Sequence, residues 1–158
     1  MVIKDLVETD FINYKRISMF IAFPKCTFKC DKEANCQICQ NSHLAKQRDI
    51  AVTPEFIVHK YESNPLTKAI VLGGLEPFDS FTDLVKLIRE IRKVTDDDIV
   101  IYTGYTETEK YNEVYKILAQ YKNIVIKFGR YIPNQKKHLD DVLGVYLASD
   151  NQYGIKIS

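Results

Sequence analysis

Four cysteines crowded into one stretch of the chain constrain its fold and chemistry more than any other feature. All of them lie between Cys26 and Cys39, directly after an apolar run that suits a buried strand. A framework of structural disulfides spreads its cysteines so that they join distant parts of a chain. Thiols gathered in one loop, in a reducing compartment, indicate instead a metal or cluster site.

The cysteine count alone does not choose the metal. Thiolates suit both Zn²⁺ and iron–sulfur clusters. A structural zinc site that uses all four cysteines would make the protein a zinc-binding interaction module. A thiol redox protein that uses Cys36 and Cys39 is a further alternative. Against it, this pair does not open a helix in a thioredoxin-like unit.

The rest of the chain alternates apolar strands with amphipathic helices, which is typical of an α/β fold. Capping residues mark three helix starts: Thr53 before Pro54, Ser80 three residues before Asp83, and Thr106 three residues before Glu109. Helices are therefore predicted over 53–62, 80–94 and 106–121. Apolar runs predict strands over 16–23, 69–72, 99–102, 123–128, 142–147 and 154–157.

Strands that alternate with helices imply a mostly parallel sheet with right-handed crossovers. The 158 residues are too few for a complete eight-unit barrel. We therefore expect one domain over residues 1–158, built as a partial, open β/α barrel with a mostly parallel sheet and an N-terminal cluster-binding loop.

Three motifs follow predicted strands, and the carboxyl ends of parallel strands share the edge where such folds bind ligands. They are the cysteine loop, the segment Gly73-Gly74-Leu75-Glu76-Pro77, and the segment Tyr102-Thr103-Gly104-Tyr105. A glycine pair lets the backbone approach a ligand closely. A carboxylate just beyond it suits a ligand ammonium group.

Charge and hydropathy exclude several other classes of function. The formal net charge is +1 and no basic stripe is present, so we expect no nucleic-acid partner. No apolar segment reaches the length of a transmembrane helix, and nothing resembles a secretion signal. We expect a cytoplasmic protein that does not associate with membranes.

Taken together, the motifs resemble the radical S-adenosylmethionine (SAM) superfamily, whose signature is Cys-x3-Cys-x-Φ-Cys with Φ usually aromatic. Cys26 and Cys30 have the first spacing, and Ile38 occupies the Φ position before Cys39. The segment 73–77 resembles the Gly-Gly-Glu-Pro motif that holds the methionine amine of SAM, with one leucine interposed.

Within that superfamily the chain looks most like the activating component of class III anaerobic ribonucleotide reductase, a glycyl-radical enzyme activase. Cys39-Gln40-Asn41 is similar to the segment that follows the third cysteine in such activases, and Asn151-Gln152 resembles a late polar segment found there. The short length of the chain also matches this group.

The resemblance implies a [4Fe–4S] cluster and SAM as cofactors, and it assigns no protein acid or base. The implied cluster ligands are Cys26, Cys30 and Cys39. The implied SAM contacts are Ile38, Gln40, Gly74, Glu76 and Thr103. The implied reaction is reductive cleavage of SAM, followed by formation of a glycyl radical on a partner reductase. Flavodoxin or ferredoxin is the implied electron donor, and a different glycyl-radical enzyme or a peptide is the alternative substrate.

One departure from the signature concerns Cys36. Eight residues separate Cys30 from Cys39, where the signature has two. An insertion lengthens the loop without moving its ends. Cys36 is then a free thiol, a redox-active thiol or a ligand in place of another cysteine. We expect that it is not a ligand, because a three-cysteine site leaves one iron open for SAM.

Overall fold

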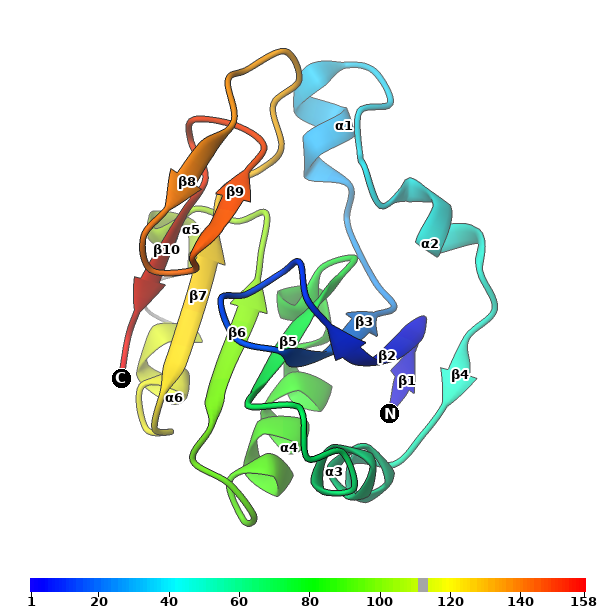
Figure 1. Cartoon of the computed structure of the whole chain (residues 1–158). Coiled ribbons are helices and arrows are strands. Elements are labelled where there is room, and N and C mark those ends of the chain that lie inside the picture. Colours follow the sequence, from blue (N-terminus) through cyan, green and yellow to red (C-terminus); the bar gives the residue numbers. More distant parts are fainter. Residues whose placement is uncertain (111–113) are drawn as a thin grey trace.

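A six-stranded mixed sheet organises the chain (Figure 1). The computed structural model describes residues 1–110 and 114–158. Strands follow the order β10-β7-β6-β5-β3-β2, and the four inner strands run parallel to one another. The sheet strands are β2 (Asp5–Asp10), β3 (Ser18–Phe23), β5 (Ala69–Gly74), β6 (Asp98–Tyr102), β7 (Ile124–Phe128) and β10 (Tyr153–Lys156).

Shorter elements surround this sheet. Two small antiparallel pairs are β1 (Val2–Ile3) with β4 (Ile50–Ala51), and β8 (His138–Asp140) with β9 (Val145–Leu147). The helices are α1 (Lys29–Ala34), α2 (Ser42–Lys46), α3 (Pro54–Glu62), the 3-10 helix η1 (Pro77–Ser80), α4 (Phe81–Ile91), α5 (Glu107–Lys110) and α6 (Lys116–Leu118). No helix among these is long and apolar enough to cross a membrane.

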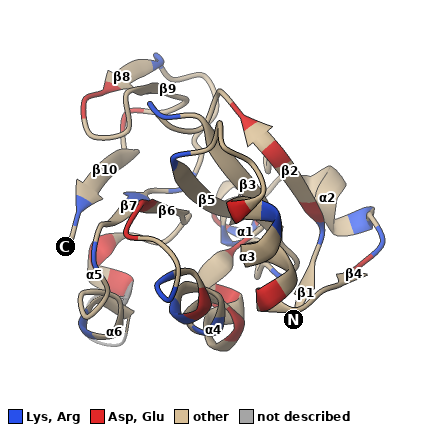
Figure 2. Cartoon of the chain, turned by 60° about the horizontal axis from the view of Figure 1, so that its bottom comes forward, with Lys and Arg blue, Asp and Glu red and all other residues tan. Residues whose placement is uncertain are grey.

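The expectation of a partial β/α barrel is wrong. Both edge strands, β2 and β10, pair antiparallel with their neighbours, so the sheet is mixed and open. Figure 2 shows α4 and α6 on one side of the sheet and the β8–β9 pair on the other. The apolar periodicity identified the parallel inner strands, but it gave no sign of the charged edge strand β2.

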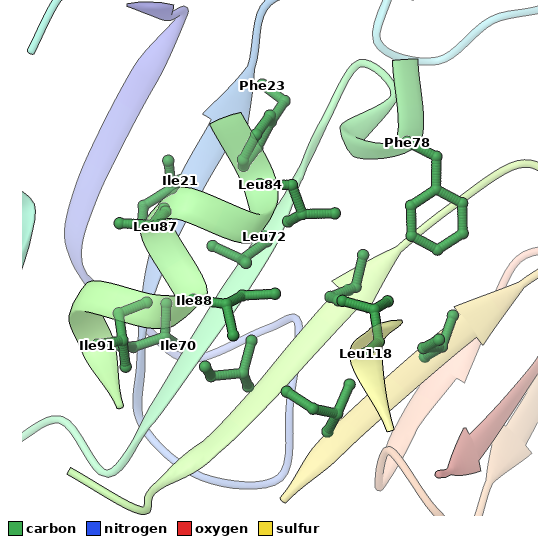
Figure 3. Close-up of a cluster of buried hydrophobic side chains, with 14 of the residues drawn as sticks. Ile21, Phe23, Ile70, Leu72, Phe78, Leu84, Leu87, Ile88, Ile91 and Leu118 are labelled. Carbon is green, nitrogen blue, oxygen red and sulfur yellow. The ribbon is translucent and has the colours of Figure 1, made fainter. Parts of the chain in front are cut away.

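The hydrophobic core lies between α4 and the inner strands. Leu84, Leu87, Ile88 and Ile91 recur at helical spacing, and each is at most 1% exposed. Figure 3 shows these side chains facing residues of the sheet such as Leu72. This packing confirms the predicted amphipathic face and fixes the inner strands side by side, which aligns their carboxyl ends.

The structure confirms some of the predicted helix starts and contradicts another. Thr53 caps α3, because its hydroxyl accepts a hydrogen bond from the Phe56 backbone N–H at 3.2 Å. Ser80 makes no such bond; the chain forms η1 first, and Glu76 caps that short helix. The Thr106 N–H and hydroxyl both donate to Glu109 Oε2 at the start of α5. The expected continuation of that helix passes through 111–113, which lie outside the described residues.

Candidate functional site

The ends of the parallel strands surround a cavity of about 430 Å³, which we call the strand-end cavity. That volume lies within the range of about 300–1,000 Å³ typical of small-molecule sites. Its walls come from the segments after β2, β3, β5, β6 and β7 and from β9. Seven of the eight implied cluster ligands and SAM contacts line it: Cys26, Cys30, Cys39, Gln40, Gly74, Glu76 and Thr103.

Three cysteines share this cavity, and the fourth does not. Cys26, Cys30 and Cys39 are half-buried, whereas Cys36 is exposed to solvent. Burial raises the pKa of the Cys26 thiol to about 12 and also raises the pKa of the Cys30 and Cys39 thiols. A thiolate at these positions therefore needs a compensating cation.

Two hydrogen bonds fix the backbone around Cys26, one to a carboxylate oxygen and one to the Cys26 sulfur. The Thr27 N–H donates to Asp79 Oδ2 at 2.8 Å, and the Phe28 N–H donates to Cys26 Sγ at 3.2 Å. Asp79 also accepts a hydrogen bond from the Tyr105 hydroxyl at 2.6 Å. The start of the cysteine loop is therefore tied both to η1 and to the segment after β6.

The segment after Cys39 is joined directly to the glycine turn. Asn41 Nδ2 donates to the Gly74 carbonyl oxygen at 2.6 Å. Gly74 has φ +85°, and a Cβ there would lie 2.6 Å from Ala22 Cα. Glycine is therefore required at this position, both for the backbone conformation and for the close approach of β3.

Ile38 is the predicted contact that the structure places elsewhere. It is half-buried, and its backbone N–H donates to Asp31 Oδ1 at 2.8 Å. Among the described residues, it is not part of the strand-end cavity lining. The predicted packing of Ile38 against an adenine remains a prediction.

Glu76 is a buried carboxylate at the centre of the site, with 5% of its surface exposed. Its oxygens accept hydrogen bonds from the Thr103 hydroxyl at 2.8 Å, the Gly104 N–H at 2.8 Å and the Phe78 N–H at 3.1 Å. Burial raises the pKa of Glu76 to about 7, although these bonds favour the ionised form. The carboxylate joins the end of β5 to the end of β6.

Sequence reasoning missed Lys127, which also lines the strand-end cavity. Its side chain is on β7, is 7% exposed and donates to the Gly129 carbonyl at 2.8 Å. Burial lowers its pKa to about 8. The available signal was a lysine in the otherwise apolar strand Ile-Val-Ile-Lys-Phe, because lysine is rarely buried unless its ammonium group has a partner.

The late Asn151-Gln152 segment braces the loop after β7. Asn151 Nδ2 donates to the Arg130 carbonyl at 2.8 Å, and Gln152 Oε1 accepts from the Ala148 and Ser149 N–H groups. Gln152 also lines the strand-end cavity. Because backbone N–H groups donate to its amide oxygen, Gln152 serves as part of a hydrogen-bonded turn.

A cluster of charged side chains lies beside α1, next to Cys26 and Cys30. Arg130 forms two hydrogen bonds to Glu109, at 2.6 and 3.0 Å, and also lies 3.4 Å from Glu33. Lys29 lies 3.3 Å from the same Glu109 carboxylate. The Arg130 guanidinium lowers the pKa of Glu109 to about 2. These pairs hold α1 against the segment after β7.

The donor set fits an iron–sulfur cluster. Three half-buried thiols border a space that is much larger than a single ion, and thiolate is the ligand that iron–sulfur clusters take. Within the described ranges, no three Cys, His, Asp or Glu side chains come close enough to hold one metal ion.

Fold and site therefore define an α/β protein with a cysteine-lined cluster cavity at the edge of its sheet. The model of one protein family, described as a 4Fe-4S single cluster domain, matches residues 15–152. The chain belongs to that family, and an iron–sulfur cluster-binding domain is present. No curated protein matches the chain.

Proposed function

We propose that this chain is a radical SAM enzyme that holds its [4Fe–4S] cluster through Cys26, Cys30 and Cys39. The observation that carries the proposal is the strand-end cavity, which combines these cysteines with a glycine turn, a buried carboxylate and a buried ammonium group. Three cysteine ligands leave one iron of a four-iron cluster open to a further ligand. The exposed position of Cys36 supports its exclusion from the ligand set.

The charges in the cavity suit an amino-acid zwitterion such as the methionyl end of SAM. Glu76 offers a carboxylate for an ammonium group, and Lys127 offers an ammonium for a carboxylate. Both groups are more than nine-tenths buried, so water screens them little. Gly74 lets the ligand approach the backbone of β5, while Gln40 and Thr103 supply polar groups at the wall.

Cys26, Cys30 and Cys39 would hold the cluster, and the bound, reduced cluster would supply the one electron that reductive cleavage of SAM requires, the chemistry that starts removal of a hydrogen atom from a glycine Cα. The residues of this chain orient SAM and keep water away from the reacting atoms. None of them is assigned as an acid or a base in this reaction.

We propose that the acceptor of the radical is a glycyl-radical enzyme of the class III anaerobic ribonucleotide reductase type. The mouth of the strand-end cavity is lined by Ile12 and Tyr146, which are 76% and 71% exposed. Phe11, next to Ile12, is 67% exposed. An apolar, open mouth is suited to the entry of a peptide loop. Flavodoxin or ferredoxin would supply the electron.

The first test is anaerobic reconstitution with iron and sulfide, followed by EPR of the dithionite-reduced protein with and without SAM. The proposal expects an S = 1/2 signal that changes when SAM is added, and release of 5′-deoxyadenosine. Cys39→Ser should abolish the signal, and Cys36→Ser serves as the matched control that keeps it. A colourless protein that binds zinc and ignores SAM would refute the proposal.

A second test addresses the partner. Mixing the reduced protein and SAM with a class III reductase should produce the EPR doublet of a glycyl radical on the reductase. SAM cleavage without such a doublet would refute the partner assignment and leave the SAM chemistry standing.

A further inference from the structure

The eight residues between Cys30 and Cys39 fold into a compact local unit. Asn35 follows the last residue of helix α1, has φ +51° and donates its N–H to the carbonyls of Asp31 and Lys32. A residue in this left-handed conformation reverses the chain after a helix. The next residue, Cys36, donates its N–H to the Asp31 carbonyl at 3.2 Å.

The Asp31 side chain then closes the unit. Its Oδ1 accepts hydrogen bonds from two backbone N–H groups, those of Ile38 and Cys39, both at 2.8 Å. The residue directly after Cys30 is thus bonded to the backbone of Cys39 itself. Through this one carboxylate, two cysteines that are far apart in the loop are brought to the same cavity.

We propose that Asp31 is a positioning residue that returns Cys39 to the strand-end cavity, so that Cys39 rather than Cys36 joins Cys26 and Cys30. The proposal rests on the cysteine ligand set given above, but not on SAM cleavage.

Local geometry supports a role in ligand selection. Hydrogen bonds to a carboxylate are stronger than those between neutral groups, and here two of them end on one oxygen. One of the two fixes the backbone of the ligand residue, which sets the direction of its Cα–Cβ bond. Cys36 lies earlier in the returning segment and is left exposed.

A simpler role for Asp31 is to stabilise α1, since it lies in the first turn of that helix. An acidic side chain near a helix N-terminus is favourable through its charge. The two roles differ in what they require. Helix stabilisation needs the charge, whereas positioning needs an acceptor oxygen at the right place.

Three variants of the full chain separate these roles. Asp31→Asn keeps an acceptor oxygen and loses the charge, while Asp31→Glu keeps the charge and moves the acceptor by one methylene. Asp31→Ala loses both. Lys32→Ala, at the exposed neighbouring position, is the matched control. Each variant is reconstituted anaerobically, and its iron content and its rate of iron loss to a chelator are measured.

Positioning predicts that Asp31→Ala and Asp31→Glu lose iron roughly tenfold faster than the wild type, the factor expected for one charge-assisted hydrogen bond. Asp31→Asn should lose iron more slowly than Asp31→Ala, because a neutral acceptor keeps about half of that bond, and Lys32→Ala should stay within about twofold of the wild type. Normal iron retention in Asp31→Glu with loss in Asp31→Asn as fast as in Asp31→Ala would refute positioning, as would wild-type retention in Asp31→Ala.

The thiols of the iron-free protein give a second readout, independent of the cluster. Alkylation followed by mass spectrometry should show Cys39 reacting faster in Asp31→Ala than in Asp31→Asn, which has lost the same charge, with the Cys36 rate the same in both. Equal rates in the two variants at both cysteines would overturn the proposal. Circular dichroism identifies a variant that fails to fold. If Asp31→Ala does not fold, Asp31→Glu is compared with the wild type in its place. A failure of SAM to alter the EPR signal would refute the proposed function and leave this test intact.

Discussion

Replacing Glu76 by glutamine tests how the centre of the site is held together. The carboxylate accepts three hydrogen bonds, and glutamine offers only one acceptor oxygen in its place. If that oxygen keeps the Phe78 and Thr103 donors, the new amide nitrogen faces the Gly104 N–H. One donor is then left unsatisfied, at a cost of about 2 kcal/mol.

The stability of the wild type depends on pH because Glu76 is buried. Its pKa is about 7 in the folded protein, against an ordinary value of 4.5. Between these values the folded state binds a proton that the unfolded state has lost, so the stability of the wild type falls as the pH rises. The full difference is about 3 kcal/mol, reached above pH 7. Glutamine does not titrate.

The unfolding free energies of the two proteins should therefore converge with pH. We expect Glu76→Gln to be about 2 kcal/mol less stable than the wild type at pH 5, and the gap to close or reverse by pH 8. Deprotonation of Lys127, whose pKa in the folded protein is about 8, raises the free energy of unfolding mainly above pH 8. The assay is urea unfolding of the reduced apoprotein, with the exposed Glu62→Gln as control. Profiles that run parallel from pH 5 to pH 8 would refute the reasoning.

Four further changes test other parts of the structure. Lys127→Met should weaken SAM binding by calorimetry roughly tenfold, while raising apoprotein stability, because a buried charge is removed. Gly74→Ala should cost at least about 2 kcal/mol in urea unfolding, given its positive φ. Leu87→Ala, at a fully buried position, should cost about 2–5 kcal/mol. Glu109→Gln should cost about 1 kcal/mol at pH 7, because the ion pair with Arg130 is partly exposed, and the difference should shrink as the pH falls from 4.5 towards 2. Wild-type values in any of these assays would contradict the corresponding contact.

The inner part of the fold was predictable because its pattern is local. The predicted helix over 53–62 corresponds to α3, and the predicted strands over 69–72 and 99–102 correspond to β5 and β6. Thr53 marks its helix by a cap within one turn of chain, and the strands are short apolar runs. Such signals depend only on residues that are neighbours in the sequence, so distant contacts do not alter the element that they predict.

The edges and the sheet class were not predictable in the same way. β2 reads Asp-Leu-Val-Glu-Thr-Asp, which has the charges of an exposed segment and no continuous apolar run. Ser80 fits a capping pattern, but Glu76 and Pro77 start a 3-10 helix just before it. In both cases the outcome depends on pairing or packing with residues distant in sequence.

In the candidate site too, some features were predictable from the sequence and others were not. The motifs that follow the parallel strands were expected at one edge of the sheet, where the carboxyl ends of those strands meet, and they do line one cavity. The ligand and SAM-contact roles of the seven residues came from the resemblance to a known family and stay predictions. Lys127 escaped notice although its position in the otherwise apolar strand β7 was an available local signal. Asp31 also escaped notice, because its partners at Ile38 and Cys39 lie across a turn whose shape depends on Asn35.

The edge strand β2 carries a consequence for how the protein behaves in concentrated solution. An unpaired strand edge is a template for another chain, and proteins protect such edges with charge, irregularity or a cover. β2 has all three: exposed Asp5 and Glu8, a register shift between Val7 and Asp10, and the Asn64 amide bonded to the Glu8 carbonyl at 2.9 Å. Strand addition along β2 is thereby disfavoured, and the chain is protected from self-association through this edge.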